Sequence, residues 1–373
     1  MLFKDFNYYI ISVDFSYGGY MKKDIDQIFE EYKKRKKEII EQNLPITGIE
    51  DAKKVYPKTK KLLKIITFLS GENIEWLKGK DVSVPSDRTV IFANTHRFKP
   101  DFEKITIVTD RPSFVIASDF RNSYGTISGW YFNTRPTIFV DPYSKEDKHY
   151  SYELMKRYLN LGLDCTIFPE AVWNLSENEI ILDTFFGSVN AALETNSLII
   201  CTAIERYGKK YIINRSEPID LSLIVKKNTD ISFGRLDKND EKQKKIINKI
   251  LNDCNIAMRD CMATLLFEIW EDIAKKDGVT KRQLIPNNYW DSFVNNLTEE
   301  WPGYKMSDND EQKFQNKFRI EQQQVERDME KLKHNINDKN MFMIASNDRF
   351  LNYMRLKDEI SEIEEIVSKR KRK

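Results

Sequence analysis

The sequence feature that most constrains the fold is a series of five short apolar runs, at residues 89–93, 114–117, 137–140, 165–168 and 198–204. Continuous apolar runs of this length are typical of strands that are buried on both faces of a sheet. Two segments between these runs, 148–161 and 184–195, carry apolar residues at helical spacing. This alternation of strands and helices predicts an α/β fold.

Amphipathic helical patterns flank the runs on both sides. Residues 20–42 and 52–69 precede them. One long apolar stripe and two further helical patterns follow them, at 246–273, 325–336 and 351–367. We therefore predict three parts, an N-terminal helical layer at 1–85, an α/β domain at 86–280 and a C-terminal helical extension at 281–373.

Composition and charge argue against several classes of function. The chain has 60 Lys plus Arg and 58 Asp plus Glu, a net charge of +2, so we expect no nucleic-acid partner. No window approaches the roughly 18 to 20 apolar residues of a membrane span, and the N-terminus lacks a secretory signal pattern. We expect a cytoplasmic protein. Its basic run at 369–373 is either a solvated tail or a peripheral contact with the inner membrane face.

The cysteines point to a reducing compartment. Cys165, Cys201, Cys254 and Cys261 lie in apolar stretches without the paired spacing of a metal site. We expect them to be reduced, buried thiols, and we expect neither a disulfide framework nor a set of metal ligands.

The first candidate for chemistry is His96, which follows the apolar run 89–93. Active sites of open α/β sheets lie at the carboxyl ends of strands. Asp101 comes five positions later, and on one continuous helix the two side chains would be about 140° apart. Pro100 breaks such a helix, so Asp101 can begin a new helix and direct its carboxylate back to the imidazole.

This pair is typical of general-base catalysis. The ordinary pKa of imidazole, about 6.5, suits the removal of a proton from an alcohol at neutral pH, and a carboxylate on the far ring nitrogen fixes the tautomer. The chain has no Gly-x-Ser-x-Gly nucleophile elbow, so direct attack by the acceptor is favoured over an acyl-enzyme. The alternative is a polar loop histidine beside an aspartate that only caps a helix.

Two further segments stand out downstream. The run at 165–168 ends in Phe168-Pro169-Glu170, so the Glu170 carboxylate either points from the carboxyl edge of a strand or is an exposed terminus. Phe185-Phe186-Gly187 opens a helix whose small residues either let a substrate approach closely or simply pack.

Together these segments resemble the glycerophospholipid acyltransferase superfamily over about residues 86–210. His96 and Asp101 match its Asn-His-x-x-x-x-Asp motif, and Phe168-Pro169-Glu170 matches the start of its Phe-Pro-Glu-Gly-Thr-Arg-Ser-like block. Residues 138–141 look like its second block, and Phe186-Gly187 with the run at 199–204 looks like its closing portion. The resemblance implies a mixed sheet flanked by helices and acyl transfer to a hydroxyl without a covalent enzyme intermediate. It also implies an acyl-CoA or acyl-carrier-protein donor, with no bound cofactor.

The departures from the family pattern fall where the family holds an acceptor phosphate with arginines. Trp173 and Pro142 stand at two such positions, and Thr95 replaces the Asn before the histidine. We therefore do not expect glycerol-3-phosphate or lysophosphatidate to be the acceptor. Other cations that could contact a phosphate are Arg97, Lys99, Arg135 and Lys145. Trp173 offers a flat face for a sugar ring or an acyl chain, or is a core residue.

The sequence thus predicts an O-acyltransferase in which His96 takes a proton from a hydroxyl of a lipid or glycan acceptor while Asp101 orients the ring. The residues expected to bind substrate are Arg97, Phe168, Pro169, Glu170, Trp173, Asn174 and Gly187, with Glu170 positioning the acceptor. The first rival is a catalytically inactive acyl-lipid-binding protein of the same fold. The others are a hydrolase that passes the acyl group to water and a helical membrane-surface or scaffold protein that works through residues 320–373. The oligomeric state stays open.

Overall fold

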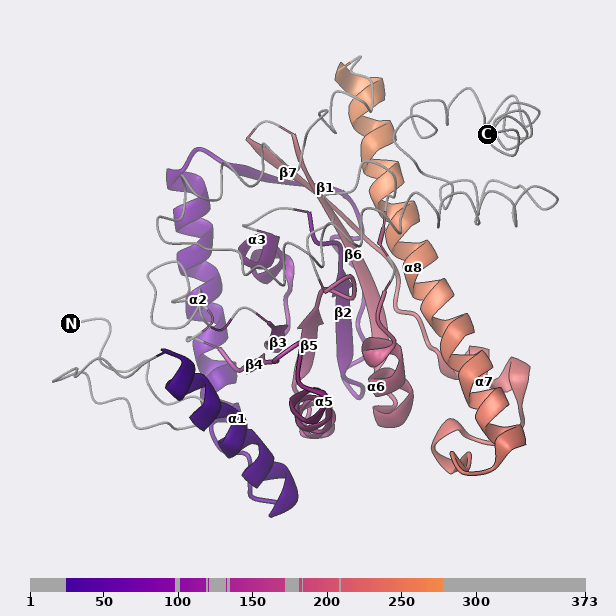
Figure 1. Cartoon of the computed structure of the whole chain (residues 1–373). Helices are drawn as coiled ribbons and strands as arrows, with labels where there is room; N and C mark the ends of the chain where they lie inside the picture. The colour runs from indigo at the N-terminus through magenta and orange to yellow at the C-terminus, as the bar shows by residue number, and fades with distance from the viewer. Residues whose placement is uncertain are drawn as a thin grey trace, which may run out of the picture.

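The computed structural model describes residues 25–97, 101–118, 120, 132, 135–171, 181–182, 184–207 and 209–277. Within these ranges a seven-stranded sheet in the order β1-β7-β6-β2-β5-β3-β4 forms the centre of the molecule (Figure 1). Neighbouring strands are parallel except β6 and β7, which are antiparallel. Helices lie on both faces, so the predicted mixed α/β sheet flanked by helices is confirmed.

The five apolar runs form strands as expected. They are β2 (Val90–Asn94), β3 (Ser113–Ala117), β4 (Thr137–Phe139), β5 (Asp164–Ile167) and β6 (Leu198–Tyr207). All five residues of β2 are buried because both of its faces are covered. Ile91 and Ala93 pack into one hydrophobic cluster, and Val90 and Phe92 pack into another on the opposite face.

Two strands were not predicted, β1 (Asn73–Lys78) and β7 (Lys210–Arg215). β1 lies inside the part that we predicted to be a helical layer, so that prediction is incomplete. It pairs in parallel with β7, with Asn73 opposite Lys210, and therefore forms an edge of the main sheet. The division at residue 85 stays a prediction, and the predicted extension at 281–373 lies outside the described residues.

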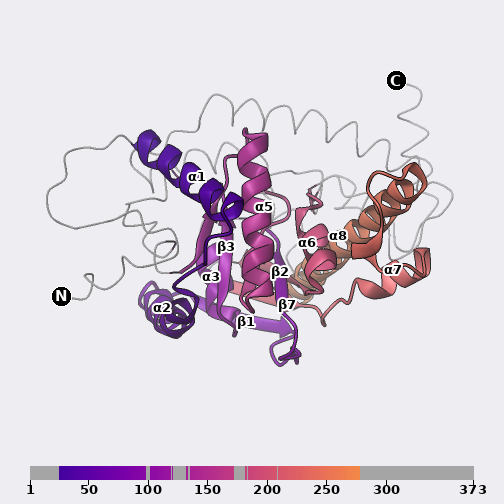
Figure 2. The same cartoon turned by 90° about the horizontal axis from the view of Figure 1, so that it is seen from below.

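Helices cover the two faces unequally (Figures 1 and 2). One face carries α5 (Lys145–Asn160), α6 (Gly187–Thr195) and α8 (Glu241–Asp277). The other carries α2 (Ile49–Leu69) and α3 (Asp101–Val108). The apolar stripe predicted at 246–273 packs along β6 and β7 as the inner side of α8. The other helices with bounds in the described ranges are α1 (Ile25–Glu41), α7 (Ser222–Asn228) and the short 3-10 helix η2 (Phe233–Arg235).

None of the helices in the described ranges combines the length and the apolar character that crossing a bilayer requires.

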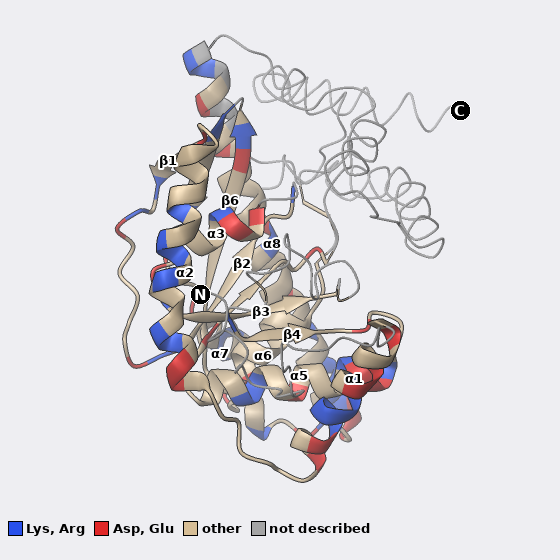
Figure 3. Cartoon of the chain, turned by 90° about the vertical axis from the view of Figure 1, so that its left-hand side faces the viewer, with Lys and Arg blue, Asp and Glu red and all other residues tan. Residues whose placement is uncertain are grey.

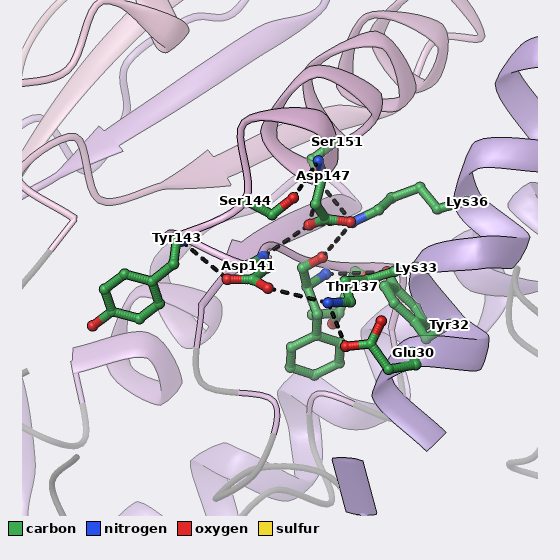
Figure 4. A network of polar contacts seen from close by, with 11 residues as sticks. Glu30, Tyr32, Lys33, Lys36, Thr137, Asp141, Tyr143, Ser144, Asp147 and Ser151 are labelled. Atoms are coloured by element: carbon green, nitrogen blue, oxygen red, sulfur yellow. Dashed lines mark hydrogen bonds and ion pairs between the residues drawn. The ribbon is translucent and has the colours of Figure 1, made fainter. Parts of the chain in front are cut away.

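A buried polar network attaches α1 to the carboxyl end of β4 (Figure 4). Lys36 Nζ donates to the Phe139 carbonyl at 2.7 Å and to Ser151 Oγ at 2.7 Å, and it lies 2.8 Å from Asp147 Oδ1. The Tyr32 hydroxyl accepts the N–H of Phe139 at 3.1 Å and donates to the Thr137 carbonyl at 3.1 Å. Since β4 is the last strand of the sheet, α1 covers an edge that would otherwise expose backbone groups. We call these residues the β4 network.

Candidate active site

The turn after β2 places His96 at the carboxyl edge of the sheet. The Asn94 side-chain amide donates to the Ile167 carbonyl of β5 at 3.1 Å. The Thr95 N–H donates to the Thr202 carbonyl of β6, and Thr95 Oγ1 accepts the N–H of Ile204, both at 3.1 Å. The backbone is therefore fixed from both neighbouring strands immediately before His96.

The two residues of the predicted pair are in contact. His96 Nδ1 lies 2.8 Å from Asp101 Oδ2, and the same oxygen accepts the N–H of Arg97 at 3.0 Å. Asp101 is fully buried and is the first residue of α3, as we predicted from the break at Pro100, a residue that itself lies outside the described ranges. When the ring is neutral and its proton is on Nδ1, the lone pair that can accept a proton is on Nε2.

Two aromatic rings frame the imidazole. The centroid of Phe168 lies 4.4 Å from that of His96, and the centroid of Phe102 lies 5.6 Å from it with the rings nearly perpendicular. The His96 side chain is 11% exposed, whereas its partner carboxylate is fully buried. Phe168, which we predicted to contact substrate, therefore packs directly on the candidate base.

Glu170 is completely buried, so it is not the exposed strand terminus considered above. Its Oε1 accepts the N–H of His96 at 3.1 Å and its Oε2 accepts the N–H of Leu182 at 2.9 Å. Backbone N–H groups are strong partners for a buried carboxylate. The two oxygens thus connect the backbone of the candidate base to the segment that leads into α6. The role of Glu170 in positioning an acceptor stays a prediction.

The residue after Glu170 has an unusual backbone. Ala171 has a φ of 57°, in the left-handed region that glycine adopts more easily than alanine. The family block that the sequence resembles has glycine at this position. The turn is closed by the Ala171 N–H, which donates to the Phe168 carbonyl at 2.9 Å.

Helix α8 holds the segment at 181–184 from its other side. Arg259 donates to the Ile181 carbonyl at 2.9 Å. Asn255 exchanges hydrogen bonds with Thr184, donating to its carbonyl at 3.2 Å and accepting from its hydroxyl at 2.9 Å. Sequence reasoning missed Asn255 and Arg259, because polar residues within a long amphipathic helix give no sign of which distant backbone they contact.

The arginines that we considered for phosphate contact are buried and have protein partners. Arg97 Nε lies 3.3 Å from Glu205 Oε2 on β6, another residue that the sequence did not single out. Arg135 donates to Thr106 Oγ1 at 2.8 Å. Arg97 is thus held next to His96 by β6, and its contact with substrate stays a prediction. Lys145 is exposed at the start of α5, and Lys99 lies outside the described residues.

Four other predicted substrate contacts have different outcomes. Pro169 is buried, and its carbonyl accepts the N–H of Phe185 at 3.0 Å. Gly187 is exposed as the first residue of α6, with open space where a Cβ would be. Trp173 and Asn174 lie outside the described residues, so their roles stay predictions.

Comparisons with known proteins found no sequence match and a distant structural match. Neither protein-family models nor the sequences of curated proteins match the chain. Among solved structures, one similar chain is the 1-acyl-sn-glycerophosphate (LPA) acyltransferase PlsC from Thermotoga maritima. The match has 14% sequence identity, covers 62% of this chain and 88% of that chain, and has a TM-score of 0.38. A likeness with a TM-score this low assigns no function to this chain.

Proposed function

We propose that this chain is an O-acyltransferase that moves an acyl group from a thioester to a hydroxyl of a lipid or glycan acceptor. The observation that carries the proposal is the 2.8 Å contact between His96 Nδ1 and a fully buried Asp101, at the carboxyl edge of parallel strands. Such a pair holds the imidazole in one tautomer and stabilises the cation that forms when Nε2 accepts a proton.

The proposed reaction is a direct transfer. His96 Nε2 takes the proton of the acceptor hydroxyl as the hydroxyl oxygen attacks the thioester carbonyl carbon. The tetrahedral species then collapses, the carbon–sulfur bond breaks, and the leaving thiolate takes the proton back from Nε2. The imidazole ends neutral, an ester has formed, and no bound cofactor takes part. Acyl-CoA or an acyl-carrier protein would supply the thioester.

The decisive experiment uses purified protein with an acyl thioester and extracts of lipids and glycans, and identifies products by mass. We expect an acylated product, and His96→Ala should lower its rate by about 10² to 10⁴ fold because general-base catalysis is lost. His149→Ala is the matched control, since His149 is exposed on α5. Free fatty acid in place of an ester would show a hydrolase. Acyl-lipid binding without any product would show a binding protein.

We further propose that Glu170 is a positioning residue, because both of its oxygens accept backbone N–H groups and neither is exposed. Glu170→Gln replaces one acceptor oxygen by an amide donor that faces a backbone N–H. The expected result is a fall in kcat with little change in the KM for the acceptor, and a changed pH profile of kcat. If Glu170 instead gripped the acceptor, KM would rise while kcat stayed the same.

A further inference from the structure

The last turns of α2 expose an apolar surface. Five large apolar side chains face solvent there: Leu62, Ile65, Ile66, Phe68 and Leu69. Phe68 is 78% exposed and Leu69 is 77% exposed, the two most exposed large apolar side chains in the described part of the chain. The opposite side of the same helix is buried through Tyr56 and Leu63. Scattered apolar side chains on a surface are ordinary, but a contiguous group marks a contact with a partner or a membrane.

Lysines run along the same side of the helix. Each of three lysines precedes an exposed apolar residue by four positions, which places the two on one face: Lys58 before Leu62, Lys61 before Ile65 and Lys64 before Phe68. All three lysines are exposed, and within the described ranges none of them has an ion-pair partner. The other lysines of α2 do pair with carboxylates: Lys53 with Glu50, Lys54 with Asp51 and Lys60 with Asp110.

This surface lies at the end of the molecule that carries the candidate active site. Lys104 of α3 donates to Thr67 Oγ1 of α2 at 3.0 Å, and α3 begins with Asp101. Figure 3 shows lysines along the lower and middle turns of α2 and mostly uncharged residues on its upper turns, next to β1. Helix α3 therefore contacts the last turns of α2 through Lys104 and the carboxyl edge of β2 through Asp101.

We propose that this face of α2, formed by Leu62, Ile65, Ile66, Phe68 and Leu69 with Lys58, Lys61 and Lys64, docks on an anionic lipid bilayer. Charge complementarity selects this partner: the apolar turns enter the boundary between headgroups and acyl chains, while the ammonium groups of the three lysines attract anionic headgroups. Docking would hold the His96 edge of the sheet at the lipid surface. The proposal does not depend on the proposed acyl transfer.

The test is cosedimentation of the full chain with vesicles of phosphatidylcholine alone or mixed with phosphatidylglycerol. We expect binding to the anionic vesicles, weaker binding to neutral ones, and loss of the difference near 1 M salt, where the Debye length falls to about 3 Å. Phe68→Ser with Leu69→Ser should weaken anionic vesicle binding by at least about tenfold. Exchange of Lys58, Lys61 and Lys64 for Gln should remove most of the preference for anionic vesicles.

Two matched controls separate this surface from general effects. Leu223→Ser with Ile231→Ser changes two exposed apolar residues elsewhere, and exchange of Lys226, Lys227 and Lys242 for Gln makes the same change in net charge on α7 and α8. Both controls, and His96→Ala, should bind vesicles as the parent chain does. Equal binding by the Phe68 and Leu69 variant and the parent chain would overturn the proposal. The proposal would also be overturned if the parent chain bound no vesicles and formed a dimer, and the Phe68 and Leu69 variant were a monomer. That result would identify a second copy of the chain as the occupant of this surface.

Discussion

The β4 network and the candidate site each contain a basic side chain paired with a buried aspartate at the carboxyl end of a parallel strand. In the β4 network, the three hydrogens of Lys36 Nζ have three acceptors and the side chain is fully buried. In the candidate site, His96 makes one contact with Asp101 through Nδ1 and its ring remains partly exposed. The Lys36–Asp147 pair is closed to solvent, as expected of a contact that stabilises the fold, whereas the His96 ring is accessible at the edge of the sheet, as the proposed proton transfer requires.

The largest expected effect that tests this comparison is on turnover. Asp101→Asn keeps the shape of the side chain, and its amide oxygen can still accept from Nδ1 and from the Arg97 N–H, but the negative charge is lost. We expect kcat for acyl transfer to fall by about 10² to 10⁴ fold, because the imidazolium that forms when Nε2 takes a proton is no longer stabilised by a carboxylate. If Asp101→Asn keeps most of its kcat, the His96–Asp101 pair is a structural contact, as the Lys36–Asp147 pair is.

The next effect is on stability. Lys36→Met leaves the Asp147 carboxylate buried without its cation, which should lower the free energy of unfolding by about 3–5 kcal/mol in a denaturant titration. The double variant Lys36→Met, Asp147→Leu should recover part of this loss, because no uncompensated charge remains. Turnover per folded molecule should stay unchanged in both. If either variant lost kcat per folded molecule, the β4 network would affect turnover as well as stability, and it would not differ from the candidate site in this respect.

A smaller effect concerns strain next to Glu170. Ala171 occupies the left-handed region, which costs an L residue about 1–2 kcal/mol, while glycine brings an entropic penalty of about 0.5–1 kcal/mol. Ala171→Gly should therefore raise the free energy of unfolding by about 0.5–1 kcal/mol. Ala192→Gly, within α6, is the control and should lower it by about 1 kcal/mol. Equal losses in both variants would mean that no strain is stored beside the site.

The smallest effect depends on pH and concerns Asp141, whose N–H donates to Asp147 of the β4 network at 2.8 Å. Burial raises the pKa of the Asp141 carboxyl, but hydrogen bonds from the Tyr143 N–H and Lys33 outweigh it, so the pKa lies below the ordinary 3.8. A lowered folded-state pKa stabilises the fold above about pH 4, and this contribution is lost as the pH falls through the folded-state value. Asp141→Asn should cost about 0.2–1 kcal/mol at pH 7 and progressively less below pH 4. A constant difference from the parent chain across this range would contradict the assignment.

The sequence allowed prediction of the parts of the fold that are buried on both faces. Its apolar runs correspond to β2 through β6, and the stripe of α8 corresponds to its packed side. β1 was missed because its residues are only half-buried and include Glu75, so neither an apolar run nor a clear alternation exists. β7 was missed because it is short and begins and ends with basic residues.

For the candidate site, the sequence predicted the contact that is local and missed the contacts that are not. His96 and Asp101 are five positions apart, so one turn and one helix start bring them together. The partners of Glu170 are backbone N–H groups of residues 96 and 182, which meet only after the sheet has formed. Lys36 was missed for a similar reason, since a lysine in a charged helix is usually solvated and its burial depends on β4 and α5.

The pairing of β1 with β7 has a consequence for the order of events during synthesis. Asn73 pairs with Lys210, and β2 pairs with β6, so an N-terminal piece of this chain has no partner strand for β1 on either side. At ribosomal rates of about 5–20 residues per second, β1 would leave the ribosome on the order of ten seconds before β7 exists. The edge of the sheet nearest α2 is therefore the last to close in the growing chain, and it is the place where a chaperone would find unpaired backbone.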